Sequence, residues 1–243
     1  MKDIHWLQRT ELLIKKERLE KLINANVLVV GMGGVGSFAA EFIARAGVGK
    51  MTIVDGDVVD PTNRNRQLPA LATTHGFSKV EWMKERLLAI NPELDLTVIN
   101  EFLRIERIKE IVLNGNYSYV VDAIDSITPK LTLISTCYNN QIPLISSMGA
   151  GAKLDPTLIR VVDISKTYNC KLAHYVRKRL KKYKIYKGVK TVFSPEEAPP
   201  DSLMYTDGSN FKKSAYGTIS YLPAAFGGVA ASVVVRDLIE WNK

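Results

Sequence analysis

A glycine-rich stretch at residues 31–36 carries the strongest chemical signal in the sequence. It follows the apolar run 27–30 and precedes residues with helical spacing, and its glycines are Gly31, Gly33, Gly34 and Gly36. The first glycine allows a sharp turn, the second lets the backbone approach a phosphate, and the last lets the helix pack close to the strand. The first amides of that helix would then face an anion. The pattern predicts a nucleotide site.

Asp55 strengthens this prediction because of its spacing from the glycines. It ends a second apolar run, residues 51–55, nineteen residues after Gly36. An acid at the end of the second strand suits hydrogen bonds from a ribose. Glycine spacings of this kind also occur in tight turns of α/β cores that bind nothing. The strand before the glycines, the helix after them and the acid together favour the nucleotide site.

Two cations and several polar residues after Asp55 favour ATP over a dinucleotide. Arg66 and Lys79 suit the β- and γ-phosphates, and each charge-assisted bond would contribute about 1.5–3 kcal/mol. Asp125 could hold Mg²⁺, which spreads phosphate charge and helps pyrophosphate leave. A dehydrogenase would need little beyond the glycine helix for its pyrophosphate. The further residues predicted to bind the nucleotide are Asp57, Asn63, Gln67, Asp122 and Ser126.

Lys79 is an unusual residue for its position. Ser78 and Glu81 predict a capping box, which makes Lys79 the first residue of a helix. A cation there opposes the helix macrodipole by roughly a few tenths of a kcal/mol. A bound anion would remove this conflict. A solvated surface lysine explains the sequence equally well.

The candidate residues lie on or directly after alternating strands and helices. This alternation predicts a doubly wound, Rossmann-like α/β fold with a mostly parallel sheet and a C-terminal extension. At 243 residues the chain is long enough for one large domain over residues 1–243. We expect strands at 27–30, 51–55, 94–99, 117–122, 142–147 and 158–162. We expect helices at about 9–22, 37–46, 79–90, 105–113, 129–140 and 223–241, with Thr128 as the cap of the fifth, and a basic helix from 171.

One segment, residues 171–190, carries the whole excess of positive charge. The net charge is +8, and residues 177–190 contain eight bases and no acid, so the rest of the chain has 25 bases against 25 acids. Tyr183 and Tyr186 lie between the cations and could stack on bases. A solvated lysine-rich helix is the alternative, but we favour contact with tRNA. The residues expected to make this contact are Arg177, Lys178, Arg179, Lys181, Lys182 and Lys184.

Residues 194–210 lack periodicity, which predicts a flexible crossover or lid.

Several classes of protein are excluded by composition and absent motifs. Cys137 and Cys170 form no CxxC pair, and the three histidines have no metal-ligand spacing. Neither GxSxG nor HExxH occurs, which disfavours common hydrolases. Core packing is the expected role of Cys137. Cys170, at the start of the basic helix, could be a stabilised thiolate, but we expect no catalytic role for it.

No membrane anchor is expected. The first residues contain no apolar h-region, and the longest mainly apolar run, residues 222–235, is 14 residues long. A membrane span needs about 20. We interpret this run as a buried helix in a cytoplasmic protein.

Taken together, these motifs resemble the adenylating domain of the ubiquitin-activating superfamily that includes MoeB, ThiF and HesA. Members of that superfamily activate a carboxylate as an acyl-adenylate. The resemblance implies that Asp55 binds the ribose and that Asp125 holds magnesium. It implies phosphate contacts from Asn63, Arg66, Gln67 and Lys79. It also implies that Arg9 is lent across a homodimer to the partner's phosphates, whereas Asp57 and Ser126 lie at positions that vary among members.

Within this superfamily the chain looks most like the tRNA threonylcarbamoyladenosine dehydratases, over nearly its whole length. The stretches that carry the likeness are residues 9–14, 65–67, 122–126, 147–157 and 163–167, with the basic helix. The likeness implies that ATP and Mg²⁺ are used to adenylate the threonyl carboxylate of a modified adenosine in tRNA. The ureido group of the same modification then closes a ring and expels AMP. Implied partners are tRNA, a second copy of the chain, and a sulfur-relay protein pair similar to CsdA and CsdE.

Two other functions stay open on the sequence. One is activation of a small sulfur-carrier or ubiquitin-like protein, as by MoeB or ThiF, which would be indifferent to tRNA. Protein-activating relatives usually carry zinc-binding CxxC pairs or a catalytic cysteine, and this chain has no such pair. The other is a non-enzymatic tRNA-binding or dinucleotide-sensing protein, which would bind NAD without hydrolysing ATP.

Overall fold

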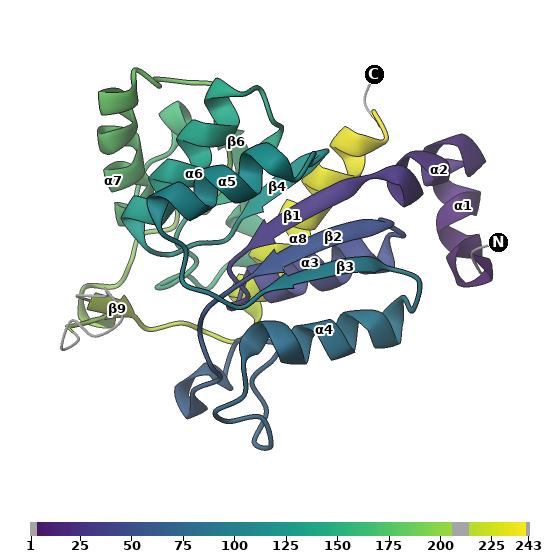
Figure 1. Cartoon of the computed structure of the whole chain (residues 1–243). Coiled ribbons are helices and arrows are strands. Elements are labelled where there is room, and N and C mark those ends of the chain that lie inside the picture. The colour runs from purple at the N-terminus through teal and green to yellow at the C-terminus, as the bar shows by residue number, and fades with distance from the viewer. Residues whose placement is uncertain (1–3, 206–213, 242–243) are drawn as a thin grey trace.

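A seven-stranded sheet forms the centre of the protein (Figure 1). The computed structural model describes residues 4–205 and 214–241. The strand order is β3-β2-β1-β4-β5-β7-β6, and only β6 runs antiparallel to its neighbour. The strands are β1 (Asn26–Val30), β2 (Lys50–Val54), β3 (Asp95–Ile99), β4 (Tyr119–Asp122), β5 (Leu144–Ser147), β6 (Arg160–Asp163) and β7 (Lys190–Phe193). The expected doubly wound, mostly parallel α/β fold is confirmed.

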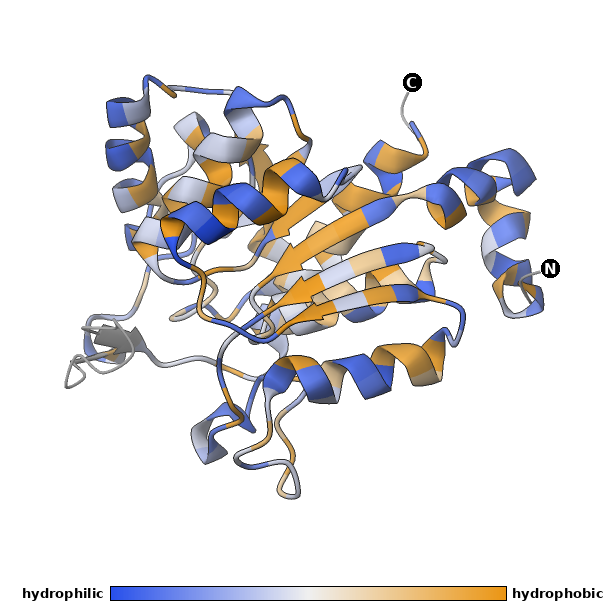
Figure 2. Ribbon diagram, viewed as in Figure 1, coloured by the Kyte–Doolittle hydropathy of each residue, from blue (hydrophilic) through white to orange (hydrophobic). Residues whose placement is uncertain are grey.

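Helices cover both faces of the sheet, which explains why its central strands β1 and β4 are mainly apolar (Figure 2). One face packs against α3 (Gly36–Arg45), α4 (Lys79–Ile90) and α8 (Tyr221–Leu238). The other packs against α5 (Ile105–Asn114), α6 (Ile127–Asn139) and α7 (Lys171–Leu180). Val27, Leu28 and Val29 of β1 are therefore fully buried from both sides.

The C-terminal helix α8 belongs to this core. Its length and composition alone would allow it to cross a membrane. Its buried residues, including Leu222, Phe226 and Val234, instead pack in the same cluster as α3 and the sheet. The expectation of a buried helix at this place is confirmed.

Two expected helix boundaries are wrong. The helix expected at 9–22 is two helices, α1 (Gln8–Ile14) and α2 (Lys16–Asn24), because Lys15 between them has a left-handed φ of 72°. Helix α6 has Ser126 as its N-cap and not Thr128. Pro129 therefore lies in the first turn, where its missing N–H breaks no helical bond.

Strand β7 was not expected from the sequence. The basic helix α7 ends at Leu180, a short 3-10 turn follows at Lys181–Tyr183, and Lys190, the last basic residue of the segment, begins β7. Strand β7 lies between β5 and β6, with Asp163 opposite Lys190. The Ile164 N–H donates to the Val189 carbonyl at 2.8 Å. Residues 164–189 thus leave the sheet and return to it at the same point.

The segment expected to be a flexible crossover, residues 194–210, contains some regular structure. A 3-10 turn at Pro200–Ser202 leads into β8 (Leu203–Tyr205), which pairs antiparallel with β9 (Ser214–Tyr216). The part of the prediction that concerns residues 206–210 lies outside the described residues.

Candidate nucleotide-binding site

The glycine stretch forms the turn between β1 and α3, at the carboxyl edge of the sheet. Gly31 has a φ of +95°, and a Cβ on it would lie 2.8 Å from the Ala123 carbonyl oxygen. A Cβ on Gly36 would lie 1.7 Å from the Gly31 carbonyl oxygen. At Gly33, by contrast, the nearest atom to an added Cβ is the Gln67 Nε2 at 3.9 Å. Packing therefore requires glycine at two of these positions, while the third leaves space in which an anion could approach the backbone.

Gly34 connects this turn to the C-terminal helix. A Cβ on it would lie 2.9 Å from the Pro223 Cβ and 3.2 Å from the Arg66 carbonyl oxygen. The glycine turn, the loop that carries Arg66 and the start of α8 therefore pack together.

Asp55, directly after β2, is tied to the same turn. Its carboxylate accepts hydrogen bonds from the Met32 N–H at 2.6 Å and from the Asp57 N–H at 2.8 Å. Burial raises the pKa of Asp55, and the charge of Lys79 and the two amide bonds oppose that rise. A carboxylate has about four lone-pair sites. Two of them remain for ribose hydroxyls.

Lys79 is not a solvated surface lysine, so that alternative is wrong. Its side chain is 5% exposed, and its Nζ lies 2.9 Å from the Oδ2 of Asp57, which is 33% exposed. The Lys79 N–H also donates to the Asp57 carbonyl. Asp57 thus holds a nearly buried ammonium at the start of α4, close to Asp55.

Arg66 and Gln67 follow a 3-10 turn at Pro61–Asn63. The side chain of Asn63 caps this turn by accepting from the Asp60 N–H at 3.2 Å. Arg66 donates to the Thr62 carbonyl at 2.9 Å and to the Asn65 side chain at 2.7 Å. Burial lowers the pKa of Arg66, and the charge of Asp125 opposes that shift. Arg66 and Asp125 therefore lie near enough at the carboxyl edge for their charges to interact.

The Gln67 side chain points to the open side of the glycine turn. Its Nε2 is the atom nearest to the space at Gly33. Its Oε1 is buried and has no hydrogen-bond partner among the described residues. A buried amide oxygen without a partner is costly, and a bound ligand or water would satisfy it.

The two acids after β4 occupy different environments. Asp125 is exposed at the carboxyl edge, and Ser126 beside it occupies the N-cap position of α6 without a side-chain capping bond. Asp122 is 0% exposed, and its carboxylate meets the Lys130 Nζ at 2.8 Å and the Ser146 hydroxyl at 2.5 Å. Asp122 was expected to bind the cofactor, but the structure encloses its carboxylate in the core and does not bring it to the open site.

Arg9 lies away from this site within its own chain. It is exposed on α1. Two residues before it, Leu7 packs against Gly47: its Cδ1 would lie 2.7 Å from a Cβ built on that glycine. Gly47 precedes β2, so Arg9 lies toward the amino edge of the sheet, opposite the glycine turn.

The basic residues expected to contact tRNA form one surface, with one exception. Lys178, Arg179, Lys181, Lys182 and Lys184 are exposed and make no ion pair with any residue that the structure describes. Tyr183 and Tyr186 are exposed among them. The exception is Arg177, which turns inward and donates to the Thr167 carbonyl at 2.9 Å.

Cys170 and Cys137 are buried, and burial raises the pKa of Cys137 to about 12.

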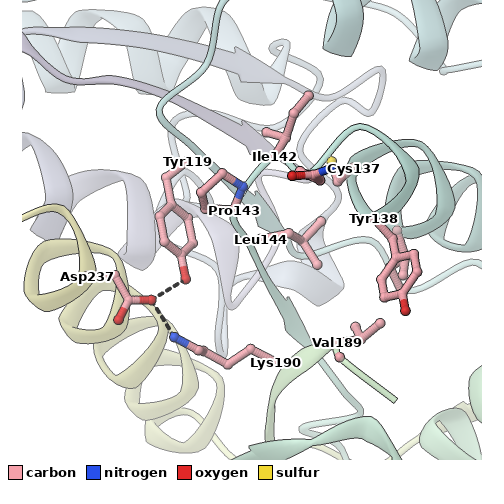
Figure 3. A pocket seen from close by; sticks show the side chains of 12 residues that line it. Tyr119, Cys137, Tyr138, Ile142, Pro143, Leu144, Val189, Lys190 and Asp237 are labelled. Carbon is pink, nitrogen blue, oxygen red and sulfur yellow. Dashed lines mark hydrogen bonds and ion pairs between the residues drawn. The ribbon is translucent and has the colours of Figure 1, made fainter. Parts of the chain in front are cut away.

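A cavity of about 540 Å³ lies at the opposite, amino edge of the sheet (Figure 3). It is lined by Tyr138, Pro143 and Leu144 among others, and its polar wall is an Asp237 carboxylate that accepts from the Tyr119 hydroxyl and the Lys190 ammonium. It is separated from the glycine turn by the length of the strands, and none of the predicted site residues lines it.

Lys130 was not singled out from the sequence, although it contacts the acid-bearing loop after β4. Its Nζ donates to the Ile124 carbonyl at 2.8 Å, besides its ion pair with Asp122. The signal was a lysine in the first turn of a helix that continues with Leu131, Leu133 and Ile134. A charge on the buried side of such a helix needs a partner.

Comparison with known proteins agrees with this geometry. A family model described as the ThiF family matches residues 7–243. A tRNA threonylcarbamoyladenosine dehydratase of Bacillus subtilis is 42% identical over 245 residues, which cover 98% of this chain and 96% of the relative. A molybdopterin-synthase adenylyltransferase of Salmonella typhimurium is more distant, at 33% identity over 63% of this chain and 61% of the relative.

Among solved structures, the crystal structure of Escherichia coli tRNA N6-threonylcarbamoyladenosine dehydratase, TcdA, in complex with ATP has a TM-score of 0.89 to this chain. The two are 38% identical, and the match covers 99% of this chain and 98% of the other. The same enzyme has also been solved in complex with AMP.

Proposed function

This chain belongs to the ThiF family, and from that premise we propose that it dehydrates threonylcarbamoyladenosine in tRNA at the expense of ATP. The observation that carries the proposal is the 42% identity to a dehydratase of that name over 98% of the chain. The glycine turn with Asp55, Arg66 and Lys79 near it at the carboxyl edge supports the use of ATP. The distant likeness to molybdopterin-synthase adenylyltransferase covers less of the chain and reflects a shared adenylation fold.

The first chemical step transfers AMP to a carboxylate. An oxygen of the threonyl carboxylate attacks the α-phosphorus of ATP, the bond to the bridging oxygen breaks, and pyrophosphate leaves. The open backbone at Gly33 would receive a phosphate, and Arg66 and Lys79 would stabilise the charge that develops on the leaving group. Asp57 keeps the Lys79 ammonium in place before ATP arrives.

Asp125 is the residue we propose to hold Mg²⁺. Magnesium usually binds through one or two carboxylates together with substrate phosphates, so a single exposed acid at this edge suits it. When bound, the ion would neutralise phosphate charge and help pyrophosphate leave. The charge of Asp125 acts on Arg66, so the proposed metal-holding acid would lie beside a proposed phosphate-binding cation.

The second step needs no nucleophile from the protein. The ureido group of the substrate attacks the acyl carbon, the bond to the AMP oxygen breaks, and a proton leaves the attacking group, which gives a net loss of water. Intramolecular attack of this kind reaches effective molarities of about 10⁵ M or more when the groups are oriented. The burial of both cysteines agrees with this route.

Two surfaces would serve the partners. The exposed cations of residues 178–184 suit the phosphates of tRNA. A homodimer would bring Arg9 to the other subunit's site, and the exposed Leu12 and Leu13 on the same helix, 76% and 69% accessible, suit such an interface. We also propose a cytoplasmic location, which suits a tRNA substrate. A sulfur-relay protein pair remains a proposed partner on the family resemblance alone.

The direct test incubates the purified protein with ATP, Mg²⁺ and tRNA that carries the modification. We expect stoichiometric AMP and, by mass spectrometry of the nucleosides, the loss of one water from threonylcarbamoyladenosine. AMP formation that ignores tRNA but depends on a small protein with a Gly-Gly terminus would overturn the proposal in favour of a carrier-protein activator.

A further inference from the structure

Lys130 and Asp122 form an ion pair in which both side chains are 0% exposed. The pair lies directly beneath the loop of residues 123–126, and the reaction steps derived above use neither residue. Ion pairs are costly to bury and contribute little net stability compared with well-packed apolar groups. Its geometry suggests a further role.

The two side chains hold one residue of the loop from both sides. The Asp122 carboxylate accepts from the Ile124 N–H at 3.0 Å, and the Lys130 ammonium donates to the Ile124 carbonyl at 2.8 Å. The carbonyl of Ile124 belongs to the same rigid peptide plane as the N–H of Asp125. Lys130 therefore fixes the orientation of the peptide group from which the Asp125 side chain departs.

The other side of the loop is fixed by the glycine turn. The Ala123 N–H donates to the Val30 carbonyl at 2.9 Å, and the Ala123 carbonyl oxygen lies only 2.8 Å from the position that a Cβ on Gly31 would take. The loop is thus held between the glycine turn and the buried pair. Asp125 follows Ile124 in this loop and is exposed at the carboxyl edge, where its charge acts on Arg66.

We propose that Lys130 and Asp122 are positioning residues that orient Asp125 toward the metal and phosphates. The inference rests on the proposed function, which makes Asp125 the residue that holds Mg²⁺. The reason for a charged pair in place of apolar side chains is then that only a donor and an acceptor together can hold the carbonyl and N–H of Ile124.

Three variants separate positioning from packing. Lys130→Met removes the donor to Ile124 but leaves the Asp122 charge unpaired, so it could fail to fold. The double variant Asp122→Asn with Lys130→Met removes both charges and keeps the core filled. Ser146→Ala is the matched control, because it removes one partner of Asp122 and leaves both bonds to Ile124 in place.

The first measurement is hydrogen–deuterium exchange of residues 123–127 in the ligand-free protein. We expect exchange about tenfold or more faster in the double variant, and unchanged in Ser146→Ala. The second is the Mg²⁺ concentration that gives half-maximal AMP formation, which should rise about tenfold, as for partners that orient a metal ligand. The affinity of the double variant for ATP in the absence of Mg²⁺ should stay within about twofold of wild type, because Asp125 then has no metal ion to hold.

A folded double variant with wild-type exchange and a wild-type Mg²⁺ requirement would overturn the inference and leave the pair as core packing. If the wild-type protein formed no AMP with modified tRNA, the proposed function would fail. The exchange measurement would still decide whether the pair holds the loop, because it uses no ligand.

Discussion

The nucleotide site and the basic segment both depend on charge, but they hold their charges in opposite ways. In the nucleotide site, Lys79 is paired with Asp57, and Asp55 accepts from two backbone amides. In the basic segment, five cations are exposed without an acid partner among the described residues. Paired, buried charges keep fixed positions, which suits a small ligand with one geometry. Unpaired, exposed charges act collectively, which suits a polyanion that can bind in several registers.

The largest effect should come from the nucleotide site. Lys79→Ala should lower the rate of AMP formation about 100- to 1000-fold, because it removes a preorganised cation from the leaving group. The measurement is AMP release with saturating modified tRNA. Lys84→Ala, a substitution of an exposed lysine on the same helix, should leave the rate unchanged. A rate within threefold of wild type for a folded Lys79→Ala protein would show that the fixed position of the Lys79 charge does not matter for AMP formation.

Arg9 tests whether the fixed charges of one site come from two chains. Arg9→Ala should lower AMP formation about 10- to 150-fold, the value of one charge-assisted bond. Mixing Arg9→Ala with Lys79→Ala subunits should restore about a quarter of wild-type activity, because half of the dimers would be mixed and each would hold one complete site. If mixed dimers form, as native mass spectrometry can show, but remain inactive, Arg9 does not act across subunits.

A smaller effect is expected from the basic segment. The double variant Lys181→Ala with Lys182→Ala should reduce the slope of log tRNA affinity against log salt by about 2, which is about 1 for each lost phosphate contact. ATP affinity should not change, since these lysines lie outside the nucleotide site. Lys84→Ala with Lys109→Ala removes two exposed lysines elsewhere and serves as the control. An equal loss of slope in the control would mean that tRNA affinity depends on the net positive charge of the protein and not on the basic segment.

The smallest effect is expected at Cys170, which lies between the two regions. Cys170→Ala should keep AMP formation within about twofold of wild type, because the ring closure is intramolecular. Loss of cyclised product with retained AMP formation would instead indicate a thioester at Cys170. The measurement compares AMP with cyclised nucleoside in the same reaction.

The same contrast explains how much could be predicted from the sequence. Strands β1, β2 and β4 and the glycine turn were predictable because apolar runs buried on both faces leave a clear pattern. Their register brings Asp55 and Asp125 to one edge without further information, since parallel strands end on the same side. The fixed position of Lys79 was not predictable, because the sequence does not show that Asp57 lies beside it.

Strand β7 was missed because charge hid its pattern. It begins with Lys190, directly after a basic run, and has only four residues, of which Thr191, Val192 and Phe193 are buried. Short strands that pair with distant segments have little local signal. Asp122 illustrates the reverse case: its place at the end of β4 was predictable, but only the structure shows that its carboxylate faces Lys130 in the core.

The return of residues 164–189 to their starting point has a consequence for how this protein could change over evolution. Because Ile164 and Val189 are joined by a hydrogen bond, the intervening chain can be exchanged for another of different outer composition without altering strand order. The buried residues of this segment constrain the replacement: Ala173, Val176 and Leu180 on the inner side of α7, and Ile164, Cys170, Ile185 and Val189 outside that helix. If residues 164–189 contact tRNA as proposed, a graft of this segment into a relative should transfer tRNA preference and leave the nucleotide site unchanged.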